Sequence, residues 1–157
     1  MDKVKATKYF IIGVRLALGL LFVYAGTQKF KKDVPKTSAS TEQVTVAQEM
    51  PAHIVKIKAY IGGLKQTGFF WPMLGIAEVL CGVLLISQVF ALLGAVMLVP
   101  LTLNIFLFEV FLGGGDPIEI LVHGLYFLGN ILIIAYGYPR LKLTFLTTDQ
   151  QFQNAIK

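Results

Sequence analysis

Two charged residues lie inside long apolar stretches of this 157-residue chain, Arg15 in the first stretch and Glu78 in the second. A charge near the middle of a bilayer costs roughly 2.5–3.5 kcal/mol on insertion scales, so such a side chain normally faces inward and has a partner. At a rise of about 1.5 Å per residue, Arg15 would lie about 10 Å inside one membrane face and Glu78 about 13–14 Å inside the other. An arginine side chain can span the remaining difference in height of about 6–7 Å. We therefore predict that Arg15 pairs with Glu78, either as a structural ion pair that fixes helix register or as a functional site around a buried carboxylate.

One face of the fourth apolar stretch carries four polar residues at helical spacing, Glu119, His123, Tyr126 and Asn130. Histidine can move protons or bind a metal. We predict no metal here, because the apolar stretches hold no second histidine and the single cysteine, Cys81, offers no useful spacing. The stripe is then either a set of hydrogen bonds between helices or a site for a proton or a polar headgroup.

The third apolar stretch adds two polar residues, Asn104 and Glu109. They are about 140° apart in helical phase, so they do not face one small cavity. Asn104 is the better interior candidate, and Glu109 is expected at the interface near Lys29 or Lys32. Pro100 would free a carbonyl and kink this helix, which either opens a pocket or accommodates packing.

The composition indicates which kind of structural element positions these residues. The chain is 55% hydrophobic and its mean hydropathy is +0.69, which is typical of a membrane protein. Backbone groups must be satisfied inside a bilayer, so the apolar stretches predict helices. The expected fold is an all-α membrane protein, a single domain over 1–157 that forms an antiparallel four-helix transmembrane bundle. The expected helices are about 9–28, 69–87, 90–112 and 118–138.

An extramembrane loop, 29–68, is expected between the first two helices. Its part from Lys31 to Glu49 is polar and expected to be extended, whereas Ala52–Leu64 places apolar residues on one helical face. That second part predicts a short helix lying in the membrane interface.

Turn signals divide the rest of the chain. A tight turn is expected at Ser87 and Gln88, and a second at Gly113–Pro117, with Pro117 suited to a helix start. Pro139 is expected to end the fourth helix.

Small residues indicate which helix faces pack. Gly19 and Gly26 share a stripe with Arg15, and Gly75 and Gly82 share one with Glu78. Because small residues let membrane helices approach closely, we predict that both stripes are packed interfaces. Cys81 lies on the second stripe and is interpreted as a small packing residue.

The first stretch resembles the opening signature of the DoxX family, an Arg, then a Gly a turn later, then a Gly-x-x-Lys-hydrophobic exit. It runs from Arg15 through Gly19 to Lys29 and Phe30. Gly75, Glu78 and Gly82 are likewise similar to the family's second-helix pattern G-x-x-E-x-x-x-G. The chain has Gln88 where many members carry an Arg, and the loop 31–66 does not align. The resemblance implies a small four-helix membrane protein of a family linked to quinone-reducing sulfur oxidation, membrane redox complexes and assembly factors.

Three functions follow as hypotheses. We predict an accessory or partner subunit of a larger membrane complex. The first alternative is a redox-linked subunit that binds a quinone-like headgroup, and the second is a proton or small-solute pathway through Glu78, His123 and Asn130. We find no autonomous catalytic motif, so the chain is an enzyme only as part of a quinone-linked oxidoreductase system. No intrinsic cofactor is expected, and a quinone is the one candidate ligand.

The expected partners are the lipid bilayer and another membrane or envelope protein, with a homo-oligomer also open. Nucleic acid is excluded, because the basic residues flank the apolar stretches and do not form a patch interleaved with aromatics. Lys and Arg divide nearly evenly between the two sides of the membrane. Three lysines crowd the start of the first helix, so we predict cytoplasmic termini in a prokaryotic inner membrane.

Overall fold

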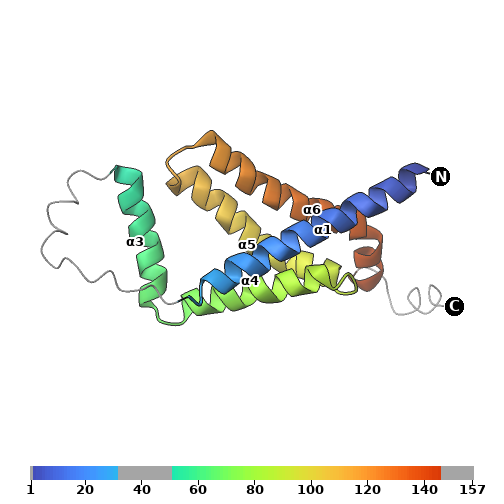
Figure 1. Ribbon diagram of the computed structural model, residues 1–157, viewed down its shortest axis with the longest axis horizontal. Helices are drawn as coiled ribbons and strands as arrows, with labels where there is room; N and C mark the ends of the chain where they lie inside the picture. Colours follow the sequence, from blue (N-terminus) through green and yellow to red (C-terminus); the bar gives the residue numbers. More distant parts are fainter. Residues whose placement is uncertain (1, 32–50, 146–157) are drawn as a thin grey trace, which may run out of the picture.

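The computed structural model describes residues 2–31 and 51–145, and every regular element in these ranges is a helix. The helices are α1 (Asp2–Gln28), α3 (Ala52–Gln66), α4 (Phe70–Ile86), α5 (Ala91–Leu112) and α6 (Pro117–Phe145) (Figure 1). The all-α class is confirmed. The polar segment that we expected to be extended lies, from residue 32 onward, outside the described residues.

Four of the helices run alongside one another. α1 packs mainly on α4, and α5 packs mainly on α6, with α4 and α5 joined by a short turn. The start of α1 and the end of α6 lie at the same end of the bundle (Figure 1). Apolar side chains from all four helices meet in the buried core, which includes Leu18, Phe22, Leu85, Leu98 and Ile133.

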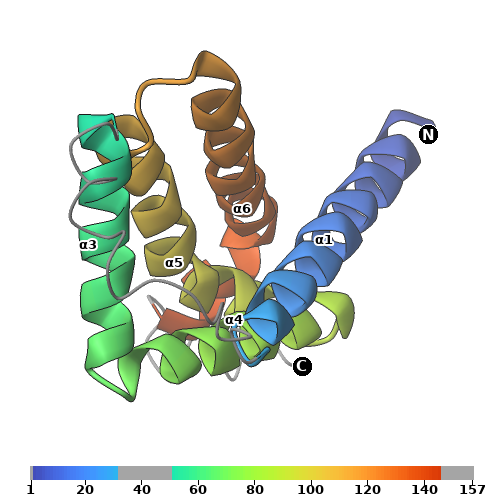
Figure 2. The same cartoon turned by 60° about the vertical axis from the view of Figure 1, so that its left-hand side comes forward.

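α3 lies across the opposite end of the bundle, roughly at right angles to α4 (Figure 2). The angle between the two helices is 91°. α3 also contacts α5, since the ring centroids of Tyr60 and Phe108 are 5.4 Å apart. The predicted helix is therefore present. Its apolar residues Ile54, Ile57, Ile61 and Leu64 are half-buried, and Lys56, Lys58 and Lys65 are exposed.

Three helices are long and apolar enough to cross a membrane by themselves: Lys5–Gln28, Ala91–Leu112 and Pro117–Leu143. α4 has 17 residues and meets the same test only together with α3, as a span broken by the 91° bend. The chain is thus an integral membrane protein with three candidate spans, or four if α4 crosses as well.

The predicted turns are confirmed and their local chemistry is clear. The Ser87 hydroxyl accepts a hydrogen bond from the Phe90 N–H at 3.3 Å, and Gln88 adopts a positive φ of 60°. At the second turn, the Asp116 carboxylate accepts a hydrogen bond from the Ile118 N–H at 2.9 Å and caps α6. Gly114 and Gly115 both have a φ of 81°, a conformation that glycine adopts without strain.

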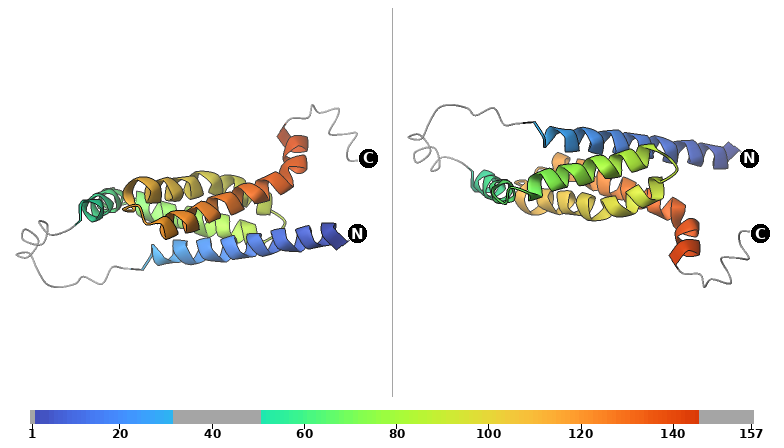
Figure 3. Two further views of the ribbon diagram at one scale, coloured as in Figure 1. Left: turned by 90° about the horizontal axis from the view of Figure 1, so that it is seen from above. Right: turned by 90° about the horizontal axis from the view of Figure 1, so that it is seen from below.

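Two helix limits differ from prediction. α1 begins at Asp2, seven residues before the expected start at Tyr9. α6 continues through Pro139 to Phe145, because a proline removes one helical hydrogen bond and kinks a helix without necessarily ending it. The last turns of α6 accordingly bend away from the bundle (Figure 3).

Candidate functional site

Glu78 is the most deeply buried charge among the described residues, and its partner is Lys29. The Lys29 ammonium lies 2.6 Å from Glu78 Oε2, and the side chains are 15% and 3% exposed. Lys29 follows the last residue of α1, and its Cβ lies against Gly75, where a methyl group would crowd it at 3.2 Å. The missing side chain at Gly75 therefore gives the lysine stem room to turn back toward the carboxylate.

The predicted pairing of Arg15 with Glu78 is wrong. Arg15 Nη1 instead donates a hydrogen bond to Gln88 Oε1 at 3.4 Å, at the turn between α4 and α5. The reason is the register of α1 on α4, in which Gly19 lies against Gly82 and Gly26 lies against Gly75. Arg15 is therefore level with the end of α4, and Lys29 is level with its beginning.

Trp71 lies beside the ion pair. The Lys29 ammonium is 5.4 Å from the Trp71 ring centroid, and the Lys65 ammonium of α3 is 5.2 Å from it. Such cation–π contacts hold a cation over an aromatic face. The indole therefore links the ends of α1 and α3 to α4.

A cavity of about 460 Å³ opens next to this group, between α1, α3, α4, α5 and α6. Its walls are mostly aliphatic and aromatic, with a few polar groups at defined points, as in binding sites for small amphipathic molecules. The polar residues that line it are Lys29, Tyr60, Glu78, Asn104, His123 and Tyr126.

Asn104 lines the cavity from α5, although the residue is exposed and not buried in the interior. The Tyr60 hydroxyl of α3 donates a hydrogen bond to Asn104 Oδ1 at 3.5 Å. This contact leaves the Asn104 amide nitrogen to donate to a ligand. Pro100 lines the same cavity one turn earlier on α5.

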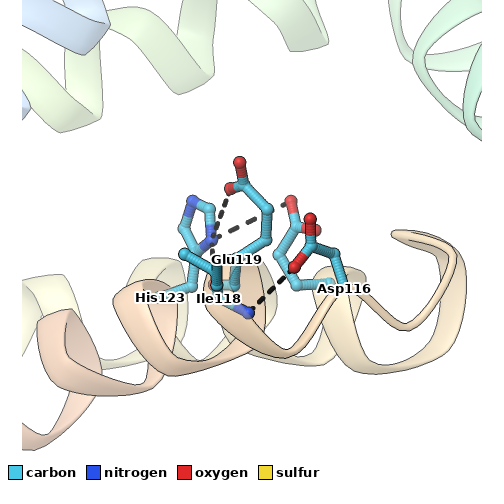
Figure 4. Close-up of polar contacts among 5 residues, drawn as sticks. Asp116, Ile118, Glu119 and His123 are labelled. Carbon is cyan, nitrogen blue, oxygen red and sulfur yellow. Dashed lines mark hydrogen bonds and ion pairs between the residues drawn. The ribbon is translucent and has the colours of Figure 1, made fainter.

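His123 and Tyr126 also line the cavity, and their rings meet edge to face at 5.5 Å. His123 Nδ1 donates a hydrogen bond to the Glu119 carbonyl one turn earlier, at 2.8 Å, which fixes the ring against α6. Figure 4 shows the imidazole and the Glu119 carboxylate on the same side of α6. Nδ1 lies 3.8 Å from Glu119 Oε2 and 4.0 Å from Glu109 Oε1.

The expected pairing of Glu109 with Lys29 is wrong, because Lys29 pairs with Glu78 and Glu109 faces His123. The alternative partner, Lys32, lies outside the described residues. α5 and α6 pack side by side, and this brings the carboxylate to the imidazole.

The ligand atoms of Glu109, Glu119 and His123 lie within 4.8 Å of one another, a spacing that a cation could use. However, Nδ1 donates to a carbonyl and so carries a proton, which leaves only Nε2 of the imidazole with a lone pair. The Glu119 side chain is 58% exposed to its surroundings. In this arrangement the imidazole is hydrogen-bonded to the Glu119 carbonyl, and the two carboxylates lie near it at 3.8 and 4.0 Å.

Asn130 lies apart from the cavity. It is fully buried, and its amide nitrogen donates to the Ala95 carbonyl at 3.1 Å and contacts the Thr102 hydroxyl at 3.5 Å. The polar stripe on α6 therefore divides: His123 and Tyr126 line the cavity, and Asn130 ties α6 to α5.

The two glycine stripes meet as packed faces of α1 and α4. A Cβ at Gly82 would lie 2.6 Å from the Gly19 carbonyl, and a Cβ at Gly26 would lie 2.7 Å from the Gly75 carbonyl. This close approach sets the register that brings Lys29 to Glu78. Cys81 is buried in the core beside these glycines, as predicted for a packing residue.

Sequence reasoning missed Lys29, Tyr60 and Lys65 as site residues. Lys29 was interpreted as a membrane flank, although its place at the exit of the first helix signature was a usable signal. Tyr60 and Lys65 belong to α3, and no pattern in the sequence indicates that this helix packs across the end of the bundle.

The family model of DoxX matches residues 10–110, which run from α1 through most of α5. No curated protein and no solved structure matches the chain. The matched region holds Lys29, Glu78 and Asn104, and therefore most of the polar lining of the cavity. It also covers more than half of the chain, so this protein is a member of the DoxX family of membrane proteins.

Proposed function

We propose that this protein is the membrane subunit of a larger redox complex and holds a quinone-like molecule in the cavity beside Lys29 and Glu78. The observation that carries the proposal is the combination of that ion pair with an apolar cavity of about 460 Å³. A volume of this size is within the range of small-molecule sites.

The lining suits a flat ring with carbonyl oxygens. The Lys29 ammonium and the Asn104 amide supply hydrogen-bond donors, while Trp71 offers an aromatic surface. Leu21, Leu74 and Leu101 line the apolar remainder, where a hydrocarbon tail would be desolvated.

Reduction of a quinone to a quinol takes two electrons and two protons. Glu78 and His123 are the groups in the cavity wall that could pass protons. The electrons are assigned to a partner protein, because the sequence has one cysteine and therefore no dithiol pair of its own. The protein would then be an accessory subunit that binds the quinone, while its partner supplies the electrons.

The proposal also includes the full four-helix topology. The 17 residues of α4 correspond to about 25 Å of helix, close to the thickness of a hydrocarbon core of about 30 Å. We infer that α4 is the fourth span and that α3, with its exposed lysines, lies at the membrane surface. Both ends of the chain are then on one side, which we assign to the cytoplasm of a prokaryotic cell.

Tryptophan fluorescence tests the ligand directly, since Trp71 is the only tryptophan and lines the cavity. Titration of the purified protein with a short-chain benzoquinone should quench the emission and reach saturation. Asn104→Leu and Tyr60→Phe should weaken binding about fivefold, the effect of one hydrogen bond worth about 1 kcal/mol.

Tyr24→Phe is the matched control, because Tyr24 is 67% exposed and does not line the cavity. It should bind the quinone as the wild type does. Quenching that never saturates, or that is identical in all variants, would contradict the proposal.

A further inference from the structure

A second cavity, also of about 460 Å³, lies at the other end of the bundle from α3. The first half of α1, the α4–α5 turn and the end of α6 form its walls. It is separate from the site described above, because the two cavities share no lining residue.

Three basic side chains converge on this cavity: Lys8 and Arg15 from α1, and Arg140 from α6. Its described lining includes no aspartate or glutamate. Arg140 is close enough to Arg15 for their like charges to repel. An anion bound between Lys8 and Arg15 would be stabilised electrostatically by both.

The arginine has unused hydrogen-bonding capacity. Arg15 Nη1 donates to Gln88 Oε1 at a long 3.4 Å, and Arg15 Nε is buried without a hydrogen-bond partner. A buried donor without an acceptor is costly, and a guanidinium has a geometry that matches two oxygens of one phosphate. The Arg15 guanidinium therefore lacks a hydrogen-bond acceptor that a phosphate group would supply.

We propose that this cavity binds a phosphate oxyanion, held by Arg15 with Lys8 and Arg140 around it. Between these charges, α1 and α5 also contribute apolar lining residues, Ile11, Ile12 and Leu92. The cavity can thus hold either a free anion or an anion that is covalently attached to an apolar group. The phosphate of an anionic lipid and inorganic phosphate share the chemistry, and the experiment distinguishes them.

The cavity lies where helices end, beside the α4–α5 turn, and lysines and arginines at such positions attract anionic headgroups. Gln88 keeps the site open to an outside anion. A carboxylate at that position would neutralise Arg15 from within the chain, whereas the glutamine amide accepts a hydrogen bond and adds no charge.

Thermal stability of the full chain in a neutral detergent tests the proposal. We would compare additions of phosphatidylglycerol, phosphatidylcholine and inorganic phosphate, the last against chloride at the same ionic strength. Stabilisation by phosphatidylglycerol alone identifies a lipid phosphate, and stabilisation by inorganic phosphate identifies a free oxyanion. Equal stabilities under all conditions would overturn the proposal.

Variants locate the effect. Lys8→Gln changes an exposed residue and should fold normally, with an apparent affinity for the anion roughly fivefold weaker. Arg15→Lys keeps the positive charge but loses the planar guanidinium, which can donate two parallel hydrogen bonds to a phosphate. It should therefore weaken binding although the charge is unchanged. Lys56→Gln is the matched control, since Lys56 is an exposed lysine on α3 outside the cavity. If Lys56→Gln lowers the affinity as much as Lys8→Gln, the binding reflects net charge and the site is refuted.

Discussion

Lys29, just after the end of α1, forms an ion pair with Glu78 in the middle of α4, with Nζ 2.6 Å from Oε2. The carboxylate is almost completely buried, so removal of either partner leaves an uncompensated charge in a low-dielectric interior. Glu78→Ala should therefore destabilise the protein by about 3–5 kcal/mol, measured by unfolding in a mild detergent. The double variant Lys29→Met/Glu78→Leu should recover most of this loss.

Double variants also test which basic residue pairs with Glu78. Arg15→Met combined with Glu78→Ala should give additive losses, because Arg15 contacts Gln88 at the other end of α4. Strong coupling between Arg15 and Glu78, with none between Lys29 and Glu78, would show that the register of α1 on α4 is different.

Gly82 is predicted to tolerate no larger residue. In Gly82→Ala the new methyl group would meet the Gly19 carbonyl at 2.6 Å and the Val23 side chain at 2.8 Å, and must push α1 away from α4. We expect a loss of about 1–3 kcal/mol, as for overpacking in other cores. Thermal melting in detergent measures it.

Gly13→Ala is the control for this substitution. Gly13 is also helical in α1, but nothing lies within 4 Å of its position for a Cβ. Alanine favours the helix over glycine, so this variant should be unchanged or stabilised by up to about 1 kcal/mol. A stable Gly82→Ala protein would argue against the close approach.

Asn130 is predicted to stabilise the α5–α6 interface. Asn130→Ala removes the hydrogen bond to the Ala95 carbonyl in a fully buried setting. The expected loss is about 1–2 kcal/mol, because hydrogen bonds between membrane helices contribute about 0.6–1.7 kcal/mol each. Quinone quenching of Trp71 should remain, since Asn130 does not line that cavity. Loss of quinone binding at unchanged stability would contradict this assignment.

The cluster of His123 with Glu109 and Glu119 is predicted to hold no resident metal, because the ring nitrogen that lies near both carboxylates is Nδ1, which carries a proton and donates to the Glu119 carbonyl. A strong chelator should leave the melting temperature unchanged, and added Zn²⁺ should give the same shift in wild type and in His123→Gln. A chelator-induced loss that Zn²⁺ restores in the wild type but not in His123→Gln would establish a metal site.

Local features of this fold were predictable. Long apolar stretches predicted the helices, since backbone groups in a membrane must bond internally, and Gly113–Pro117 predicted a turn that the Asp116 cap completes. The glycines at 19, 26, 75 and 82 predicted the faces that pack, because small residues are needed wherever helices come this close.

The partners of the charges were not predictable in the same way. The depth estimate assumed that the apolar stretches of α1 and α4 begin and end at the same heights, whereas the contact of Gly19 with Gly82 places Arg15 beside the α4–α5 turn. Register depends on contacts such as Gly19 on Gly82, which the sequence shows only as two separate stripes. The position of α3 depends on the bend after Gln66, so Tyr60 could not be assigned to the cavity, nor Lys65 to the Trp71 ring.

Native mass spectrometry of the protein, extracted from its own host in a mild detergent, tests the central claim most directly. The account predicts a second protein in stoichiometric amount and a retained mass of quinone size, which Asn104→Leu should retain in reduced amount while Tyr24→Phe keeps it. A chain that carries no such mass, or an Asn104→Leu variant that retains it fully, would contradict the assignment of the cavity beside Lys29 and Glu78.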